Sequence, residues 1–288
     1  MSRKTDDGEG MGETIKVILQ ALAIAFVVRV FLYQPFNIPS GSMKETLLIG
    51  DFIFVSKLSY GLSRFSFPRY LDLCVPFTDS CTTFRVLPDM MSSGRVWSAE
   101  PKRGDVIVFK LPSDVDGDNK ESPKDYIKRL VGLPGDTIEM KNGVLRINGT
   151  DVPKVKTGTF ENLECSSYEQ RCRQVKYTVN EETLPNGVKH HTLDLEPNNR
   201  ADNKGPFKVP EGHYFMMGDN RDNSVDSRFD PKTDEGGGVG FVPYENLVGR
   251  ADVIFYSCAS DEPGRCSWFK PWNWPSDIRW SRFFDLVR

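Results

Sequence analysis

The chain has 288 residues, of which 39% are hydrophobic and 27% charged. This balance excludes a chain that is disordered throughout and suits one sizeable core with appendages. The formal net charge is -3, so the charge gives no sign of a polyanionic partner and we expect no nucleic acid.

The first predicted element is a transmembrane helix. Residues 15–33 read IKVILQALAIAFVVRVFLY, close to the ~20 apolar residues that a helix needs to cross a bilayer. Arg3, Lys4 and Lys16 favour a cytoplasmic tail at residues 1–14, with the remainder of the chain outside the membrane. A cleaved signal peptide is the alternative, but the run ends in Gln-Pro-Phe, without a small-x-small cleavage site.

A serine-containing turn and several strands follow. Pro39 and Gly41 interrupt regular structure around two serines, and the apolar run from Asp51 to Leu58 predicts a strand. We expect residues 34–150 to form the first part of a catalytic core. Residues 64–100 look like an insertion, because they are rich in Pro, Ser and aromatic residues and have no sustained period.

The same part of the core contains the clearest local patterns. Residues 103–112 and 125–131 predict strands with β-branched, apolar character. Asn142-Gly143 lies between two alternating runs, which indicates a hairpin with a type I′ turn. The solvated loop from residue 113 imitates a calcium-binding loop, but Asn119 and Asp125 stand where Gly and Glu are required.

The second half of the chain is also expected to be β-rich. We assign residues 151–212 to a β-rich cap, 213–257 to the second part of the core, and 258–288 to a Trp-rich segment. Tryptophan among cations is typical of a membrane interface, although a terminal segment packed by its aromatic rings explains the composition equally well. The predicted fold is mostly β: a membrane-anchored catalytic core with a cap insertion and one N-terminal transmembrane helix.

The six cysteines fall into three pairs of near neighbours, namely Cys74 with Cys81, Cys165 with Cys172, and Cys258 with Cys266. An even, paired pattern favours disulfides in an oxidising compartment. The alternative is that some cysteines are buried as small hydrophobic residues. No pair has Cys-x-x-Cys spacing and the three histidines do not complete a zinc site, so we expect neither metal nor cofactor.

A histidine-dependent hydrolase is disfavoured. His190 and His191 lie in a polar segment and His213 beside an apolar run, without a Gly-x-Ser-x-Gly signature. We expect each of these side chains to be exposed or satisfied. Lysine can act as a general base where apolar surroundings lower its pKa, and Lys128 lies in a predicted buried strand.

Four segments then carry a family resemblance. Residues 39–51 (PSGSMKETLLIGD) resemble the serine box of bacterial type I signal peptidases, and residues 103–109 (RGDVIVF) resemble a further strand of that family. Residues 125–136 (DYIKRLVGLPGD) are similar to its lysine box, and residues 218–228 (GDNRDNSVDSR) to its last box. One departure is that Lys44-Glu45 stands where many relatives have a proline, which should loosen this turn slightly.

The resemblance implies a role for each matching residue. Ser42 would be the nucleophile, Lys128 the general base, and Ser224 the hydroxyl that orients the lysine amine. Ser40 would complete an oxyanion hole beside the backbone N–H of Ser42, and Asp226 would pair with Arg228 to brace the loop. The shallow substrate pockets would be lined by Phe36, Ile38, Met43, Leu47, Val108, Tyr126 and Ile127.

The expected activity is cleavage of signal peptides from preproteins, with a preference for Ala-x-Ala before the cut. The expected place is a bacterial inner membrane, with the N-terminus cytoplasmic and the catalytic domain periplasmic. The lipid bilayer and the export machinery would be partners. A catalytically silent, membrane-tethered binding module is one alternative. Another Ser/Lys peptidase, such as a self-cleaving repressor, is disfavoured by the apolar N-terminal run.

Overall fold

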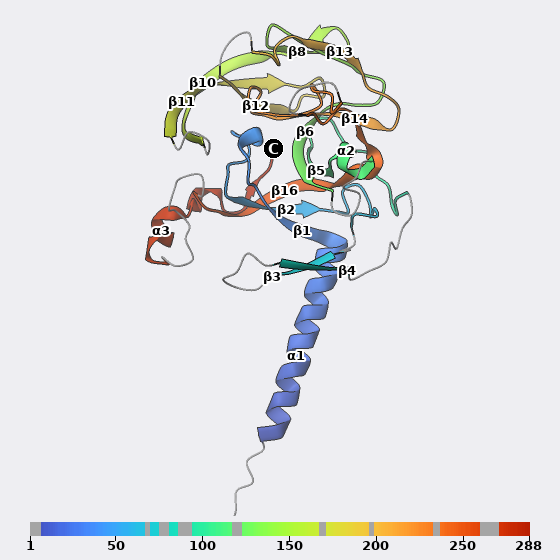
Figure 1. Cartoon of the computed structure of the whole chain (residues 1–288), viewed down its shortest axis with the longest axis vertical. Helices are drawn as coiled ribbons and strands as arrows, with labels where there is room; N and C mark the ends of the chain where they lie inside the picture. Colours follow the sequence, from blue (N-terminus) through green and yellow to red (C-terminus); the bar gives the residue numbers. More distant parts are fainter. Residues whose placement is uncertain are drawn as a thin grey trace, which may run out of the picture.

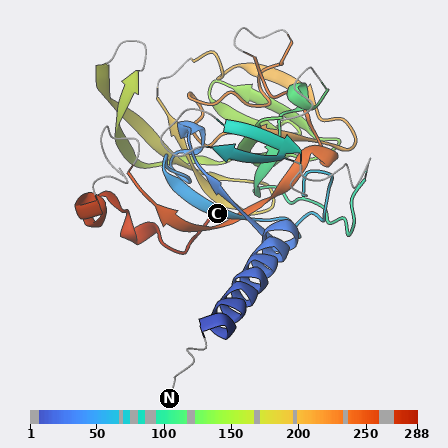
Figure 2. The ribbon, with the colours of Figure 1, turned by 60° about the horizontal axis from the view of Figure 1, so that its bottom comes forward.

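The computed structural model describes residues 7–66, 70–74, 81–85, 94–116, 123–166, 171–195, 199–232, 237–259 and 271–288. One long helix, α1 (Asp7–Val27), extends away from a β-rich body (Figures 1 and 2). Some sequence predictions lie outside the described residues: the tail up to residue 6, much of the 64–100 insertion, most of the calcium-like loop, and both Cys266 and Trp268.

Within the described residues, the largest sheet has eight strands in the order β1-β2-β16-β5-β6-β14-β15, with β17 paired to β16. All of its pairings are antiparallel. Its strands are β1 (Tyr33–Asn37), β2 (Asp51–Ser56), β5 (Val106–Lys110), β6 (Asp125–Gly132), β14 (His213–Met217), β15 (Val242–Pro243), β16 (Leu247–Ser257) and β17 (Asp285–Leu286). The predicted strands at residues 51–58, 103–112 and 125–131 are therefore confirmed as β2, β5 and β6.

Three smaller sheets complete the described part of the body, with β10, β11 and β12 forming a sheet at the upper left of Figure 1. The first comprises β10 (Lys154–Ser166), β11 (Arg171–Thr183) and β12 (Lys189–Asp194). The second has the order β13-β7-β8-β9, with bounds β7 (Thr137–Lys141), β8 (Val144–Ile147), β9 (Thr150–Asp151) and β13 (Lys204–Lys208). The third pairs β3 (Tyr70–Cys74) with β4 (Cys81–Arg85).

The predicted hairpin at residues 142–143 is confirmed. β7 and β8 pair antiparallel, and the two residues between them have positive φ angles of 50° for Asn142 and 74° for Gly143. A type I′ turn requires positive φ at both central positions. The Asn-Gly pair therefore fixes the register of this hairpin by local conformational preference.

Among the described residues the helices after α1 are short, as expected for the predicted mostly β fold. α1 continues as the π-helix η1 (Val28–Leu32), and the other helical segments are η2 (Gly41–Met43), α2 (Pro112–Asp116), η3 (Tyr244–Asn246), η4 (Pro271–Asn273), α3 (Trp274–Asp277) and η5 (Trp280–Arg282). The predicted span of residues 15–33 is divided among α1, η1 and the start of β1, because Tyr33 already pairs with Ser56 of β2. No helix in the described part of the chain is long and apolar enough to cross a membrane.

The core is divided by the main sheet, as the alternation along β5 demonstrates. Val106 and Val108 join one buried cluster, with Ile38, Leu47 and residues of β2 and β16. Ile107 and Phe109 join a second cluster with Leu130 and residues of β14. Successive side chains of a strand point to opposite faces, so β5 is buried on both faces and anchors its neighbour β6.

Two of the cysteine pairs lie opposite each other in hairpins. Cys74 is the cross-strand partner of Cys81, and Cys165 is that of Cys172. Directly opposed residues of antiparallel strands have Cα atoms about 4.5–5.5 Å apart, a spacing that a disulfide can bridge. The described residues include no free cysteine, and the three pairings remain a prediction.

Candidate active site

The turn that carries Ser42 is short and firmly attached. Ser40 has extended backbone angles (φ −125°, ψ 153°) and precedes the single 3₁₀ turn η2. Met43, with no exposed surface, anchors the turn in the core, and its carbonyl accepts a hydrogen bond from the N–H of Leu47 at 2.7 Å. Ser42 is left half-buried at the mouth of a pocket.

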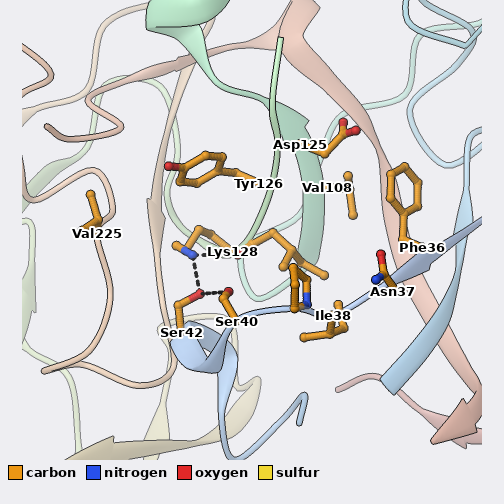
Figure 3. A pocket seen from close by; sticks show the side chains of 12 residues that line it. Phe36, Asn37, Ile38, Ser40, Ser42, Val108, Asp125, Tyr126, Lys128 and Val225 are labelled. Atoms are coloured by element: carbon orange, nitrogen blue, oxygen red, sulfur yellow. Dashed lines mark hydrogen bonds between the residues drawn. The ribbon is translucent and has the colours of Figure 1, made fainter. Parts of the chain in front are cut away.

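Lys128 approaches this turn from β6. It pairs with Ile107 of β5 and is 3% exposed. Alternation places its side chain on the same face of the strand as Tyr126 and Leu130, which belong to a largely buried apolar cluster. Its Nζ donates to Ser42 Oγ at 2.7 Å and to the carbonyl of Ile127 at 3.0 Å (Figure 3).

Burial lowers the pKa of Lys128 from 10.5 to about 8. The ammonium form loses its hydration in this apolar environment, and the positive charge of Arg228 disfavours it further, while Asp226 and Asp219 act in the opposite direction. A useful fraction of the amine is therefore neutral near neutral pH. A neutral amine in contact with a serine hydroxyl can accept its proton.

Asn220 holds the serine turn from the opposite side. Its backbone N–H donates to the carbonyl of Ser42 and its Nδ2 to the carbonyl of Gly41, both at 3.1 Å. The hydroxyls of Ser40 and Ser42 are 3.5 Å apart (Figure 3). Sequence reasoning did not single out Asn220, because an amide beside the Asp219 carboxylate carries no chemistry of its own.

Ser224 lies next to the turn but is not bonded to the lysine in this structure. It is 7% exposed, and its Oγ has no hydrogen-bond partner within the part of the chain that the structure describes. A Cβ on Gly218 would lie 2.2 Å from that Oγ and 2.6 Å from the carbonyl oxygen of Ser42. Only glycine allows this approach, because real Cβ atoms do not come so close to other heavy atoms.

Asp226 and Arg228 form a buried ion pair that shapes the loop after β14. The guanidinium donates to both carboxylate oxygens at 2.9 Å, and Asp226 also accepts from the N–H of Gly218 at 3.0 Å. Burial alone raises the pKa of the Asp226 carboxyl, but the adjoining guanidinium and these hydrogen bonds outweigh it, and the net shift is downward.

Two further buried ion pairs were not predicted. Arg129 binds both oxygens of Asp219, at 2.8 and 2.7 Å, and Asp219 also accepts from the hydroxyl of Thr46 at 2.6 Å. Arg221 binds both oxygens of Glu182 on β11 at 2.7 Å each. Arginine forms such bidentate pairs with carboxylates readily, but sequence does not reveal which partner each will meet.

The prediction for His190 was wrong. Its side chain has no exposed surface and lies 3.7 Å from Glu182, and neither ring nitrogen has a hydrogen-bond partner among the described residues. Burial lowers the pKa of this imidazole to about 3, with the nearby Arg129 acting in the same direction. Successive side chains of its strand point alternately to the body and to solvent, and His190 points to the body. Its polar neighbours in the sequence did not indicate this burial.

A pocket of about 370 Å³ opens beside the two side chains. Val225 lies at one side of it and Phe36 and Val108 at the other (Figure 3). Five of the predicted lining residues are in the wall, and two are not: Met43 and Leu47 are fully buried in the core beneath. The complete lining is Phe36, Asn37, Ile38, Pro39, Ser40, Ser42, Val108, Asp125, Tyr126, Ile127, Lys128 and Val225.

The chain is similar in sequence to known proteins over most of its length. The family model described as signal peptidase, peptidase S26, matches residues 11–256. The chain is 38% identical over 242 residues to a signal peptidase I of Rickettsia typhi, covering 82% of this chain and 76% of the relative. A signal peptidase I of Rickettsia canadensis is 36% identical over 260 residues, covering 88% and 83%. A solved signal peptidase I from Enterococcus faecalis V583 is 25% identical, with 53% of this chain and 97% of that chain covered, at a TM-score of 0.27.

Proposed function

The chain belongs to the signal peptidase family, peptidase S26, and we propose that it cleaves preproteins with Ser42 as nucleophile and Lys128 as general base. Its activity is that of a signal peptidase I, a serine peptidase. The observation that carries the proposed roles is the 2.7 Å contact between Lys128 Nζ and Ser42 Oγ, made by an amine whose pKa burial lowers to about 8.

The first half of the reaction forms an acyl-enzyme. Neutral Lys128 takes the proton of Ser42 as Oγ bonds to the carbonyl carbon of the scissile peptide, and the carbonyl oxygen takes up the negative charge. The hydroxyl of Ser40 and the N–H of Ser42 stabilise this oxyanion. The protonated amine then gives its proton to the leaving nitrogen as the carbon–nitrogen bond breaks.

The second half regenerates the enzyme. Lys128, neutral again, takes a proton from a water molecule that attacks the ester carbon. The tetrahedral intermediate collapses with release of the acid, and Ser42 recovers its proton from the lysine. Ser224 is proposed to orient the amine during these transfers.

The pocket supports a substrate with small side chains. The chain segment before the cut would lie extended between residues 36–40 and the start of β6, both of which line the pocket, and bind as an added strand. In such a strand alternate side chains point into the enzyme. An Ala-x-Ala sequence before the cut fits this geometry, with Ile38, Val108 and Ile127 in contact with the two alanines.

We also propose that the protein is held at a bacterial inner membrane. The described apolar side chains of α1 are mostly exposed, among them Val17, Leu19, Leu22 and Ile24 at 61–66%. Contact with lipid would cover them. With residues 1–14 in the cytoplasm, the catalytic body would lie in the periplasm, where preproteins leave the export machinery. The enzyme would associate with that machinery.

The test is cleavage of one preprotein by the detergent-purified protein, beside a Ser42→Ala variant. Cleavage by the wild type and none by the variant would support the nucleophile. Undiminished cleavage by Ser42→Ala would contradict it. A wild-type protein that binds the preprotein without cleaving it would favour the alternative of a silent binding module.

A further inference from the structure

Residues 271–288 lie beyond residue 256, where the family match ends, and part of this segment returns to the site. We call residues 279–288 the strap. Its strand β17 pairs with β16 through Val253 and Ile254. Two flanking backbone bonds, from Phe284 to Ile254 at 2.8 Å and from Val287 to Asp252 at 3.0 Å, extend this attachment.

The strap contacts the loop that follows the nucleophile through two arginines. Arg282 donates to both oxygens of Asp51, at 3.1 and 2.6 Å, and to the carbonyl of Thr46 at 2.9 Å. Arg279 donates to the carbonyl of Ile49 at 2.9 Å. The strap thus holds two carbonyls of the loop after Ser42 and the carboxylate of Asp51 at the start of β2, although it lies more than two hundred residues later in the sequence.

Asp51 is the point at which these contacts meet. Its side chain has no exposed surface. Besides Arg282, it accepts from the N–H of Leu48 at 2.8 Å and from the hydroxyl of Ser257 at 2.6 Å. Removing the cation from a buried carboxylate is strongly destabilising, so Arg282 stabilises Asp51 in the position from which it holds this loop.

Thr46 continues the connection to the reacting groups. Its carbonyl accepts from Arg282, while its hydroxyl donates to Asp219 at 2.6 Å. Asp219 is held by Arg129, the neighbour of Lys128, and the next residue, Asn220, holds the carbonyl of Ser42. A displacement of Thr46 would therefore be transmitted both to Ser42, through Asn220, and to Lys128, through Arg129.

We propose that Arg282 is a positioning residue of the reaction, which fixes the loop after Ser42 through Asp51 and Thr46 and so keeps the serine hydroxyl within reach of Lys128. The inference rests on the roles proposed above for Ser42 and Lys128. Arg282 itself touches neither residue nor substrate. Its effect should therefore appear in the chemical step and not in substrate binding.

The experiment compares four variants of the full chain by cleavage of a preprotein and by thermal unfolding. Arg282→Ala removes all three hydrogen bonds, whereas Arg282→Lys keeps the charge but cannot hold two carboxylate oxygens and a carbonyl in the same geometry. Arg282→Ala leaves the Asp51 carboxylate without its cation, and the double variant Arg282→Ala/Asp51→Asn removes that carboxylate as well. Arg250→Ala is the matched control, because Arg250 is 43% exposed and its ion pair among the described residues is with Asp252, two residues further along the same strand β16.

We expect Arg282→Ala to lower kcat about tenfold or more, with KM changed by less than about twofold. The midpoint of its pH profile should stay at the wild-type value. The kcat of Arg282→Lys should lie between those of Arg282→Ala and the wild type. The double variant should recover most of the lost Tm but not the lost kcat. Arg250→Ala should match the wild type in both.

A double variant that recovers kcat together with Tm would show that Arg282 matters only for stability and would overturn the inference. Wild-type kcat in Arg282→Ala, or a loss confined to KM, would overturn it as well. Ser42→Ala is measured in parallel. If that variant remained active, the proposed nucleophile would fail whatever the result for Arg282.

Discussion

The protonation of Lys128 gives the most direct quantitative prediction. With a pKa of about 8, about 9% of the amine is neutral at pH 7, compared with about 0.03% for a lysine that keeps its ordinary value of 10.5. Burial thus raises the amount of active base at neutral pH roughly 300-fold. The cleavage rate should rise about tenfold from pH 6 to pH 7, reach half its maximum near pH 8, and level off above about pH 9.

The perturbation that complements this titration is Lys128→Arg. A guanidinium stays protonated at all of these pH values, so the variant keeps a positive charge but has no base. General-base catalysis contributes about 10²–10⁴-fold, and we expect kcat to fall by at least that factor, to the level of Lys128→Ala.

The assay is single-turnover cleavage of a preprotein across the pH range. Lys57 provides the control, because burial also lowers its pKa to about 8, while its Nζ donates to the carbonyl of Ser66 and not to Ser42. Lys57→Met should therefore keep the wild-type midpoint. A flat profile, a midpoint that moves with Lys57, or an arginine variant with a good fraction of wild-type activity would refute the reasoning.

Three further predictions concern the dyad itself, the glycine beside it and the cysteine pairs. The Ser42→Ala/Lys128→Ala double variant should be hardly slower than either single variant, because the two residues act as a unit, and additive losses in kcat would contradict this. Gly218→Ala should lower kcat by about tenfold or more through the overlap with Ser224 and the Ser42 carbonyl, whereas Gly212→Ala, which has no neighbour within 4 Å, should affect stability alone. Peptide mapping without reductant should find Cys74–Cys81, Cys165–Cys172 and Cys258–Cys266, and crossed pairs would count against the local pattern.

The elements that could be predicted from the sequence are those that local physics determines. The turn at Asn142-Gly143 follows from the positive φ angles that this pair tolerates. β5 and β6 follow from runs of β-branched and apolar residues. The prediction for residues 15–33 was less successful, since hydropathy does not reveal where β1 begins. That boundary is set by pairing of Tyr33 with Ser56, far along the chain.

The candidate site likewise has a part that local sequence predicts and a part that depends on tertiary packing. Lys128 could be suspected from its apolar strand, but Ser42 lies 86 residues away, and only the family resemblance connected the two. Met43 and Leu47 were expected in the pocket because the family resemblance implied it, yet which way an apolar side chain points in an irregular loop depends on the core below it. The partners of Arg129 and Arg282 could not be predicted from the sequence either, because they too depend on the tertiary packing.

The buried charges around Lys128 explain how an amine can be deprotonated beside two carboxylates. Asp226 and Asp219 each favour the ammonium form, and unpaired acids at these positions would keep the base protonated. Each instead binds a guanidinium, Arg228 for Asp226 and Arg129 for Asp219. Because each pair has no net charge, its field at the amine is weak, and desolvation becomes the largest influence on its pKa. The two ion pairs thus brace the loops and, by neutralising both acids, leave the burial of Lys128 to set its basicity.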